Sequence, residues 1–377
     1  MRIGIYLGKV FKSTVGGGHV FEENFIDSLL KTDVKHDIIV YYFSGKNLYK
    51  NTNQVKFVNL SKIFFGLSFI PFIKKNIFNF VTKRDKIDLV YYCTPKYAYT
   101  DLPNVFTLWD LGHRVMPMFP EVSQKHQYEK REENFTQPLQ RASMVFVGNN
   151  EGKKNICTYY NVDTDKVKIV KMPTPMDIFS ITPDEKILEK LKIKSREYIY
   201  YPAQFWAHKN HIRIIKAIRI LKEQGHNFKA VFSGADKFNQ SYIKQKVKEY
   251  GIEDRVIFAG FVTREELAGL YKNAHALVYA SLLGPDNIPP LEAMALDCPA
   301  IVSDLKGHIE QFGDNAIFFK STDEYDLAEK ISSLNRLEIA EKLENAKKMA
   351  QMRNFDNYVK TAFLNINELV KYFECWK

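Results

Sequence analysis

The chain has 377 residues, a length that predicts two domains of roughly 150 to 200 residues each. Hydrophobic residues make up 45% of it and charged residues 26%, which is ordinary for a folded protein and excludes a largely disordered chain. The formal net charge of +10 is compatible with nucleic acid, an anionic membrane or phosphorylated small molecules as partners, and equally with a lysine-rich surface that only aids solubility.

The cysteines stand far apart and form no CxxC pair, so we expect neither a zinc site nor a disulfide framework, and a reducing cytoplasm as the location. They are Cys93, Cys157, Cys298 and Cys375. The apolar run at the N-terminus is too short for a signal peptide. Since no stretch reaches about 18 uninterrupted apolar residues, we expect no transmembrane helix.

The first half of the chain begins with a short apolar run at residues 2–7, which predicts a buried strand. A glycine-rich loop follows, and residues 21–31 have the spacing of an amphipathic helix. Further runs typical of strands covered on both faces occur at 36–43, 87–93, 105–110 and 143–148.

The same alternation starts again at residues 197–203 and continues to residue 321. Strands are expected at 228–234, 255–260, 275–281, 299–304 and 316–321, with helices between them at 211–225 and 264–274. The alternation predicts two doubly wound α/β halves with parallel sheets, joined near the proline-containing stretch 171–186. Residues 358–376 are predicted to form one long amphipathic helix.

Ligands of such sheets bind beyond the carboxyl ends of the strands, so we expect the chemistry in the loops there and in the cleft between the halves. Gly16, Gly17 and Gly18 follow the first strand and allow close backbone approach to a phosphate or sugar. Their spacing is not GxGxxG, and a flexible turn is an equally good interpretation.

Lys209 lies between a predicted strand and a predicted helix, where a lysine provides a mobile positive charge suited to a phosphate. For a single lysine, a solvated surface position is the competing interpretation. Phe205, Trp206 and His208 make this loop unusual without being diagnostic.

The stretch from Gly284 to Ala295 predicts a helix that starts at Pro289, because proline is favoured at the first helical position. Asp286 or Asn287 is the expected cap, and the following amides would face an anion. Glu292 then lies in the first turn and should point away from a phosphate, towards ribose hydroxyls that a carboxylate can accept. The alternative is that it only complements the helix dipole.

Asp110 and His113 follow a strand of the first half, and either could orient an acceptor hydroxyl, although a structural role is the commoner one. The segment 62–84 mixes Phe and Ile with Lys74, Lys75, Lys83 and Arg84. It fits an anionic bilayer surface and equally a core helix, or two packed helices broken at Pro71, with a solvated basic face.

Several motifs, taken in order along most of the chain, resemble those of the glycosyltransferases of family 4. They are GGGH, WDLGH…FPE, PAQFWAHKNHIRIIKAI, RVIFAGFVTREELAGLYKNAHALVYAS and IPPLEAMALDCPAIVSD. The resemblance is strongest from Tyr198 to Ala316 and implies the GT-B fold, with two Rossmann-like doubly wound domains facing a deep cleft. It places an N-terminal acceptor-side domain at 1–176, with 357–377 packing back on it, and a nucleotide-sugar-binding domain at 177–356.

The resemblance also implies an activity: transfer of a sugar from a nucleotide sugar to an acceptor hydroxyl, with retention and without a bound metal or other cofactor. Lys209 would contact the diphosphate, and Glu292, as the second acid of E-x7-E, would hold the ribose. Gly16 to Gly18 would line the cleft opposite the donor. The base would lie against Phe261, Val262 and Thr263. The donor type, whether UDP, GDP or dTDP, and the acceptor stay open. We expect a saccharide or lipid-linked saccharide acceptor at the inner membrane face, and no nucleic acid partner.

Two positions depart from the family pattern. Gly284 stands where the first acid of E-x7-E would be, and Ala203-Gln204 replaces the Gly-Arg pair before the lysine. Our hypothesis is that Asn287 and the backbone at Ile288 and Pro289 recognise the sugar, and that Gln204 donates a neutral hydrogen bond. The alternatives are a phosphorylase or sugar-phosphate synthase of the same fold, a catalytically inactive nucleotide-sugar-binding subunit, and, from the charge alone, a nucleic-acid-binding protein.

Overall fold

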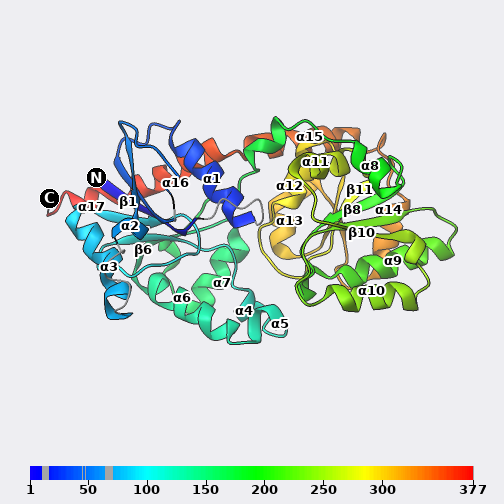
Figure 1. The fold of residues 1–377 in the computed structure, drawn as a ribbon, viewed down its shortest axis with the longest axis horizontal. Helices are drawn as coiled ribbons and strands as arrows, with labels where there is room; N and C mark the ends of the chain where they lie inside the picture. Colours follow the sequence, from blue (N-terminus) through cyan, green and yellow to red (C-terminus); the bar gives the residue numbers. More distant parts are fainter. Residues whose placement is uncertain (11–16, 45, 47, 64–70, 377) are drawn as a thin grey trace. The chain divides into compact units, whose positions relative to one another are not determined.

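The computed structural model describes residues 1–10, 17–44, 46, 48–63 and 71–376. Within these residues the strands form one seven-stranded and one six-stranded sheet, and every strand pairing is parallel. Figure 1 shows helices on both sides of each sheet. The two doubly wound parallel sheets predicted from the sequence are therefore confirmed.

The first sheet has the strand order β3-β2-β1-β4-β5-β6-β7. Its strands are β1 Arg2–Lys9, β2 Asp37–Phe43, β3 Val55–Asn59, β4 Leu89–Tyr92, β5 Asn104–Thr107, β6 Ala142–Val147 and β7 Val167–Ile169. The helices that accompany this sheet are α1 Gly17–Leu29, α2 Leu60–Ile63, α3 Pro71–Arg84, α4 Gly112–Val115, α6 Gln127–Arg141, α7 Asn150–Tyr160, α16 Phe355–Asn367 and α17 Val370–Phe373.

The second sheet has the order β10-β9-β8-β11-β12-β13. Its strands are β8 Tyr198–Pro202, β9 Lys229–Ser233, β10 Val256–Gly260, β11 Ala276–Tyr279, β12 Ala300–Ser303 and β13 Ile317–Phe319. Its helices are α5 Pro120–Ser123, α8 Lys186–Leu191, α9 His211–Glu223, α10 Gln240–Glu249, α11 Arg264–Asn273, α12 Pro289–Ala295, α13 Lys306–Phe312, α14 Glu324–Ser332 and α15 Ala340–Met352.

The second sheet is buried on both faces, as its near-continuous apolar strands require. Every residue of β11 and β12 is buried. Helices α9 and α10 lie on one face of the sheet and α11 and α12 on the other (Figure 1). Because the chain leaves β8 towards β9 and returns to β11 on its other side, the strand order reverses at β8.

The chain divides into two units whose limits differ from the predicted domains. Unit 1 contains Met1–Arg114, His126–Lys171 and Phe355–Lys377, and unit 2 contains Val115–Lys125 and Met172–Asn354. The segment 115–125, which lies inside the predicted domain 1–176, belongs to unit 2, because it packs on the loops of the second sheet. Glu121 accepts a hydrogen bond from the backbone N–H of His208 at 2.8 Å, and Lys125 lies 4.4 Å from the ring centroid of Phe238.

The C-terminal segment was expected as one long helix, and the structure instead has α16 followed by the short α17. Helix α16 packs on α1 of the first unit, and Ser28 donates a 2.6 Å hydrogen bond to Asp356. Strands β3 and β7 were not predicted. Each lies at an edge of the sheet and contains a lysine that interrupts its apolar run.

Helix α3 shows how the described part of the basic, aromatic segment 62–84 packs. Ile77, Phe78 and Val81 are buried, and the ring of Phe78 lies 4.8 Å from that of Tyr6 on β1. Lys83 forms an ion pair with Asp101. This face of the helix is part of the core, while residues 64–70 lie outside the described residues.

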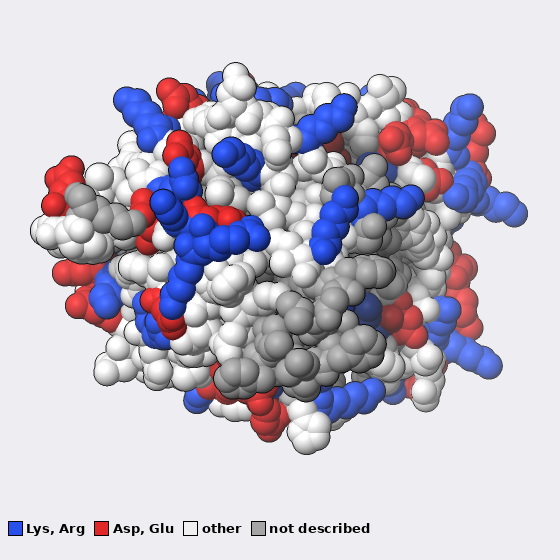
Figure 2. Space-filling view, turned by 60° about the vertical axis from the view of Figure 1, so that its left-hand side comes forward, with Lys and Arg blue, Asp and Glu red and all other residues white. Residues whose placement is uncertain are grey.

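No helix among the described residues is long and apolar enough to cross a membrane. On the face of the molecule that Figure 2 shows, Lys and Arg side chains lie interspersed with Asp and Glu side chains. The net positive charge is therefore not gathered into one basic stripe on that face.

Candidate functional site

The loops of unit 2 that leave β8 and β11 meet at the point where the strand order reverses. Lys209 ends a 3-10 turn, Ala207–Lys209, in the loop after β8. Its Nζ donates to the hydroxyl of Tyr279 at 2.8 Å and to that of Ser281 at 3.3 Å, at the end of β11. The predicted loop lysine is thus brought to the place where open α/β sheets bind ligands.

Lys209 is half-buried, and its ammonium lies 5.1 Å from the ring centroid of Tyr279. Within the described part of the chain no carboxylate lies within 4.0 Å of it, since its partners are two neutral hydroxyl groups. An ammonium has three donors and accepts no hydrogen bond, so one N–H is left to bind an anion. The arrangement is suited to a phosphate group.

Asn287 was expected to cap α12 or to hold a sugar, and the structure uses it differently. Its Nδ2 donates to the carbonyl of Gly284 at 3.1 Å and to Nε2 of His308 at 2.7 Å, and its Oδ1 accepts from the hydroxyl of Tyr279. The side chain is only 7% exposed, and both amide hydrogens have partners inside the protein. Asn287 is therefore a support of the site.

The N-cap of α12 is Ile288, with no side-chain cap, so the expected cap at Asp286 or Asn287 is wrong. Pro289 and Pro290 occupy the first two helical positions and have no N–H. The start of this helix therefore offers no backbone N–H at these two positions.

Gly284, which stands in place of the family's first acid, has φ +106°. A side chain at this angle is strained whatever the space around it, and a Cβ would lie 3.3 Å from Oδ1 of Asn287. The loop thus needs a glycine at this position. Close approach also explains Gly234, after β9, where a Cβ would collide with the backbone of Ala203 and Gln204.

Glu292 is buried on α12, and its carboxylate already has two protein partners. Arg264 donates to Oε1 at 2.8 Å, and the hydroxyl of Tyr271 donates to Oε2 at 3.1 Å. Arg264 also makes a bidentate ion pair with Asp177, at 2.6 and 2.9 Å. The charge of Glu292 is therefore balanced inside the protein, and two of its lone pairs are left for further donors.

Gln204 and Phe261 lie in the loops that follow β8 and β10. Oε1 of Gln204 accepts from the indole N–H of Trp206 at 3.0 Å, and the donor of this side chain is its Nε2. Phe261 follows β10 with 62% of its surface exposed, although large apolar side chains are usually buried. Val262 comes next, and Thr263 is the N-cap of α11, with a capping box to Glu266.

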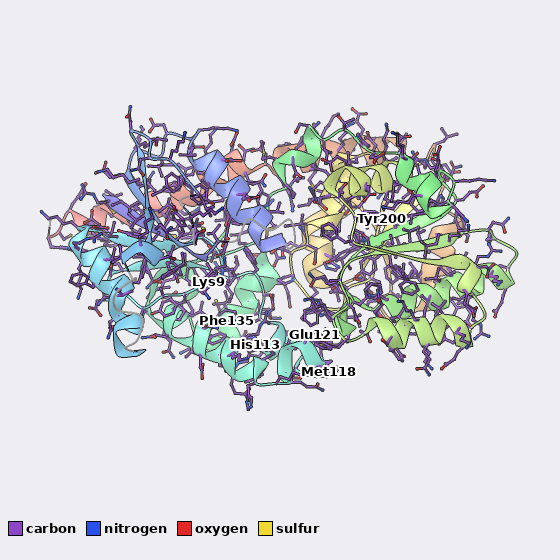
Figure 3. All side chains as sticks on the ribbon, in the orientation of Figure 1. Lys9, His113, Met118, Glu121, Phe135 and Tyr200 are labelled. Carbon is purple, nitrogen blue, oxygen red and sulfur yellow. The ribbon has the colours of Figure 1, made fainter. Side chains whose placement is uncertain are left out.

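His208, next to Lys209, is held by Glu121 through both its backbone N–H and its Nδ1. Burial acts to raise the pKa of Glu121, but the hydrogen bonds from His208 bring it below its usual value. Glu121 comes from α5, and Figure 3 shows it close to Met118 of the same segment. The FPE motif therefore supports the lysine loop.

Asp110 and His113 belong to unit 1 and have structural partners there. Asp110 forms a bidentate ion pair with Arg131, at 2.9 and 3.2 Å, and accepts from the N–H of Gly112. His113 is fully buried beside Phe135, as Figure 3 shows, and its Nε2 lies 2.7 Å from Glu132. Burial lowers the pKa of His113 despite this hydrogen bond.

Glu132 is the centre of the cluster around His113. Burial acts to raise its pKa, but hydrogen bonds from Arg114, Tyr160 and His113 lower it to about 2. The cluster has the character of a structural network, and the acceptor-orienting roles of Asp110 and His113 stay predictions. Gly17 and Gly18 begin α1, while Gly16 lies outside the described residues.

Sequence reasoning missed Arg264, Tyr279 and His308. Arg264 directly follows the predicted base-binding segment, and an arginine at a helix start is a weak signal on its own. Tyr279 ends an apolar strand and has the pattern of a core residue.

Among the described residues there is no group of three or more His, Cys, Asp or Glu side chains that could hold a metal ion.

Part of the chain is similar in sequence to known glycosyltransferases. Residues 183–353, less than half of the chain, match the family model for "Glycosyl transferases group 1". The "O-antigen chain mannosyltransferase RfbU" of Salmonella typhimurium is 29% identical over 219 residues, which are 58% of this chain and 55% of the relative. The "Uncharacterized glycosyltransferase MJ1607" of Methanocaldococcus jannaschii is 30% identical over 164 residues, 42% of this chain and 41% of the relative. The matches thus span about half the length of these curated relatives.

Solved structures match along nearly the whole chain. A glycosyltransferase from Rickettsia africae has a TM-score of 0.70 at 16% identity, covering 98% of both chains. WaaG, a glycosyltransferase involved in lipopolysaccharide biosynthesis, has a TM-score of 0.67 at 16% identity, covering 96% of this chain and 98% of WaaG. Anabaena HepE in complex with UDP has a TM-score of 0.65 at 17% identity, covering 99% and 100%. The chain therefore has the GT-B fold, and its residues 183–353 are similar to the glycosyl transferases of group 1.

Proposed function

We propose that this chain is a retaining, metal-independent hexosyltransferase that moves a sugar from a nucleotide sugar to an acceptor hydroxyl, in the assembly of a surface polysaccharide or lipid-linked glycan. The observation that carries the proposal is Lys209, a cation without a carboxylate partner among the described residues, at the strand-order reversal of unit 2. The match of residues 183–353 to glycosyl transferases supports it.

In this proposal Lys209 stabilises the diphosphate as it leaves. The bond between the anomeric carbon and the phosphate oxygen breaks, and the acceptor oxygen bonds to the same face of that carbon. The departing phosphate oxygen takes the acceptor's proton, so the reaction needs no protein nucleophile. An ammonium about 4 Å from a unit negative charge contributes up to about 4 kcal/mol at an effective dielectric constant near 20, and charge that develops on leaving is stabilised most.

The other residues recognise the nucleotide. Phe261 is exposed and available to stack on the base, and Glu292 accepts ribose hydroxyls with its remaining lone pairs. Gln204 donates from Nε2 to a phosphate oxygen, where a neutral amide replaces an arginine. The sugar contacts the backbone near Ile288 and Pro289, while Asn287 supports this loop through its hydrogen bonds to Gly284 and His308.

The nucleotide of the donor is left to experiment, because the names of the relatives point to different sugars and nucleotides. RfbU is named a mannosyltransferase, whereas HepE was solved with UDP and with UDP-glucose. A panel of UDP, GDP and dTDP in a thermal-shift assay separates these possibilities. At 100 times its Kd, a ligand stabilises the folded state by about 2.7 kcal/mol, which raises the Tm of a domain of this size by roughly 5 to 10 °C.

Lys209→Ala is expected to remove most of this shift, because the diphosphate loses its cation. Lys272→Ala is the matched control, since Lys272 is a surface lysine of the same unit that pairs with Glu185 at 3.0 Å. If none of the three nucleotides shifts the wild-type protein, the proposed function is wrong. Binding without release of nucleotide from any sugar donor would identify an inactive binding subunit instead.

We also propose a lipid-linked acceptor at an anionic, cytoplasmic membrane face. It rests on the basic and aromatic composition of 62–84, of which α3 uses one face for the core. Flotation with vesicles of anionic and of neutral lipid checks it. Absence of binding to the anionic vesicles at low salt would refute this part of the proposal.

A further inference from the structure

A continuous chain of hydrogen bonds runs from Lys209 into the interior of unit 2. Lys209 contacts the hydroxyl of Tyr279, and this hydroxyl contacts Oδ1 of Asn287. Nδ2 of Asn287 contacts Nε2 of His308, and Nδ1 of His308 contacts the carbonyl of Ser303 at 3.0 Å. Tyr279, Asn287 and His308 are at most 7% exposed, so the chain is shielded from water.

The direction of every bond in this chain follows from its ends. The ammonium of Lys209 only donates, so the hydroxyl of Tyr279 accepts from it and gives its one hydrogen to Asn287. The carbonyl of Gly284 only accepts, which requires Nδ2 of Asn287 to face it and Oδ1 to face Tyr279.

The second hydrogen on Nδ2 of Asn287 then points to Nε2 of His308, which must be unprotonated to accept it. His308 carries its hydrogen on Nδ1 and donates it to the carbonyl of Ser303. A neutral ring of this one tautomer therefore holds the Asn287 amide in the orientation that the carbonyl of Gly284 also requires. That orientation in turn leaves a lone pair of Tyr279 directed at Lys209.

We propose that Tyr279, Asn287 and His308 are positioning residues that act through this chain on Lys209 and hold its ammonium group at the strand-order reversal. The geometry of the chain stands by itself, and its effect on diphosphate binding rests on the proposed function. Ser281 adds a second acceptor at 3.3 Å, so Tyr279 determines the direction of the lysine and Ser281 only limits its movement.

The first test measures Lys209 itself and is independent of activity. The full-length protein is acetylated with limiting acetic anhydride, and mass spectrometry measures the labelling of Lys209. The internal reference is Lys216 on α9, which forms an ion pair with Glu324. Tyr279→Phe is expected to raise relative labelling of Lys209 about fivefold, the effect of losing one net hydrogen bond.

The matched control is Tyr198→Phe, which removes a hydroxyl that is equally buried and bonds the carbonyl of Leu270 at 2.7 Å, with no link to Lys209. His308→Ala is expected to raise labelling of Lys209 as well, because Asn287 then keeps only the carbonyl of Gly284 as a partner for its amide hydrogens and is held less firmly. His308→Gln should restore much of the protection, since its amide oxygen can accept from Asn287.

The second test is a double-mutant cycle on binding of UDP, GDP and dTDP. If Tyr279 acts through Lys209, Tyr279→Phe weakens binding of the favoured nucleotide about fivefold in the wild type and not further in Lys209→Ala. Additive losses, or unchanged Lys209 labelling in a Tyr279→Phe protein of native Tm, would overturn the proposal. Raised labelling with no effect of either variant on nucleotide binding would instead refute the diphosphate role of Lys209 and leave the positioning chain supported.

Discussion

Introducing an acid at position 284 should destabilise the protein and leave donor binding no tighter. Gly284 has φ +106°, where a residue with a side chain loses on the order of 1 to 3 kcal/mol. The new Cβ would also lie 3.3 Å from Oδ1 of Asn287, the atom that accepts a hydrogen bond from the hydroxyl of Tyr279. We expect Gly284→Glu to lower the free energy of unfolding by about 2 kcal/mol, and the Tm of this unit by roughly 4 to 8 °C.

Differential scanning calorimetry checks this prediction with two matched variants. Gly284→Ala introduces the backbone strain without the charge, so it should account for most of the loss in the free energy of unfolding. Gly225→Ala has a similar φ of +85° but no atom within 4 Å of the new Cβ, so it should lose less. A Gly284→Glu protein as stable as the wild type, or one that binds its nucleotide more tightly, would refute the reasoning.

Three further effects follow from the contacts of unit 2. Arg264→Met leaves the buried carboxylate of Glu292 without its cation, and urea unfolding should show that the free energy of unfolding falls by about 2 to 3 kcal/mol. The double variant Arg264→Met/Glu292→Gln should recover part of this loss, and losses that simply add in the double variant would contradict the pairing. Phe261→Ala should weaken nucleoside diphosphate binding about tenfold by calorimetry without changing the Tm, because the ring is exposed, and unchanged affinity would exclude base stacking. Burial lowers the pKa of His308 from 6.5 to about 4, so its contribution to stability is complete above pH 6.5 and falls by about 1.4 kcal/mol per pH unit as the pH drops towards 4. In urea unfolding, His308→Gln should lack this part of the dependence of the free energy of unfolding on pH, and the same dependence in the variant and the wild type would refute the prediction.

The strands of the fold could be predicted where burial on both faces leaves a continuous apolar run. Strands β8 and β11 are of this kind, and their positions agree with the prediction to within two residues at each end. Strand β3, with the sequence VKFVN, and β7, with VKI, were missed because an edge strand exposes part of its surface and tolerates a lysine. The split between α16 and α17 was missed because amphipathic spacing continues across it.

The candidate site could be predicted only where a residue type in a loop carries the signal. Lys209 was found this way, since it follows a strand and precedes a helix. Asn287 was assigned to a helix cap by its local position, but its tertiary partners Tyr279 and His308 determine its role. The pairing of Arg264 with Glu292 joins residues 28 apart on two helices, and no local pattern indicates it.

The central claim is that Lys209 stabilises the diphosphate that leaves the sugar. The most direct measurement is the rate at which nucleoside diphosphate is released from the sugar nucleotide whose base the binding panel identifies, in wild type and Lys209→Ala. We expect a fall on the order of 10²-fold or more, equivalent to about 2.7 kcal/mol of barrier, with the Tm unchanged and Lys272→Ala fully active. A Lys209→Ala protein that keeps the wild-type rate would contradict the claim.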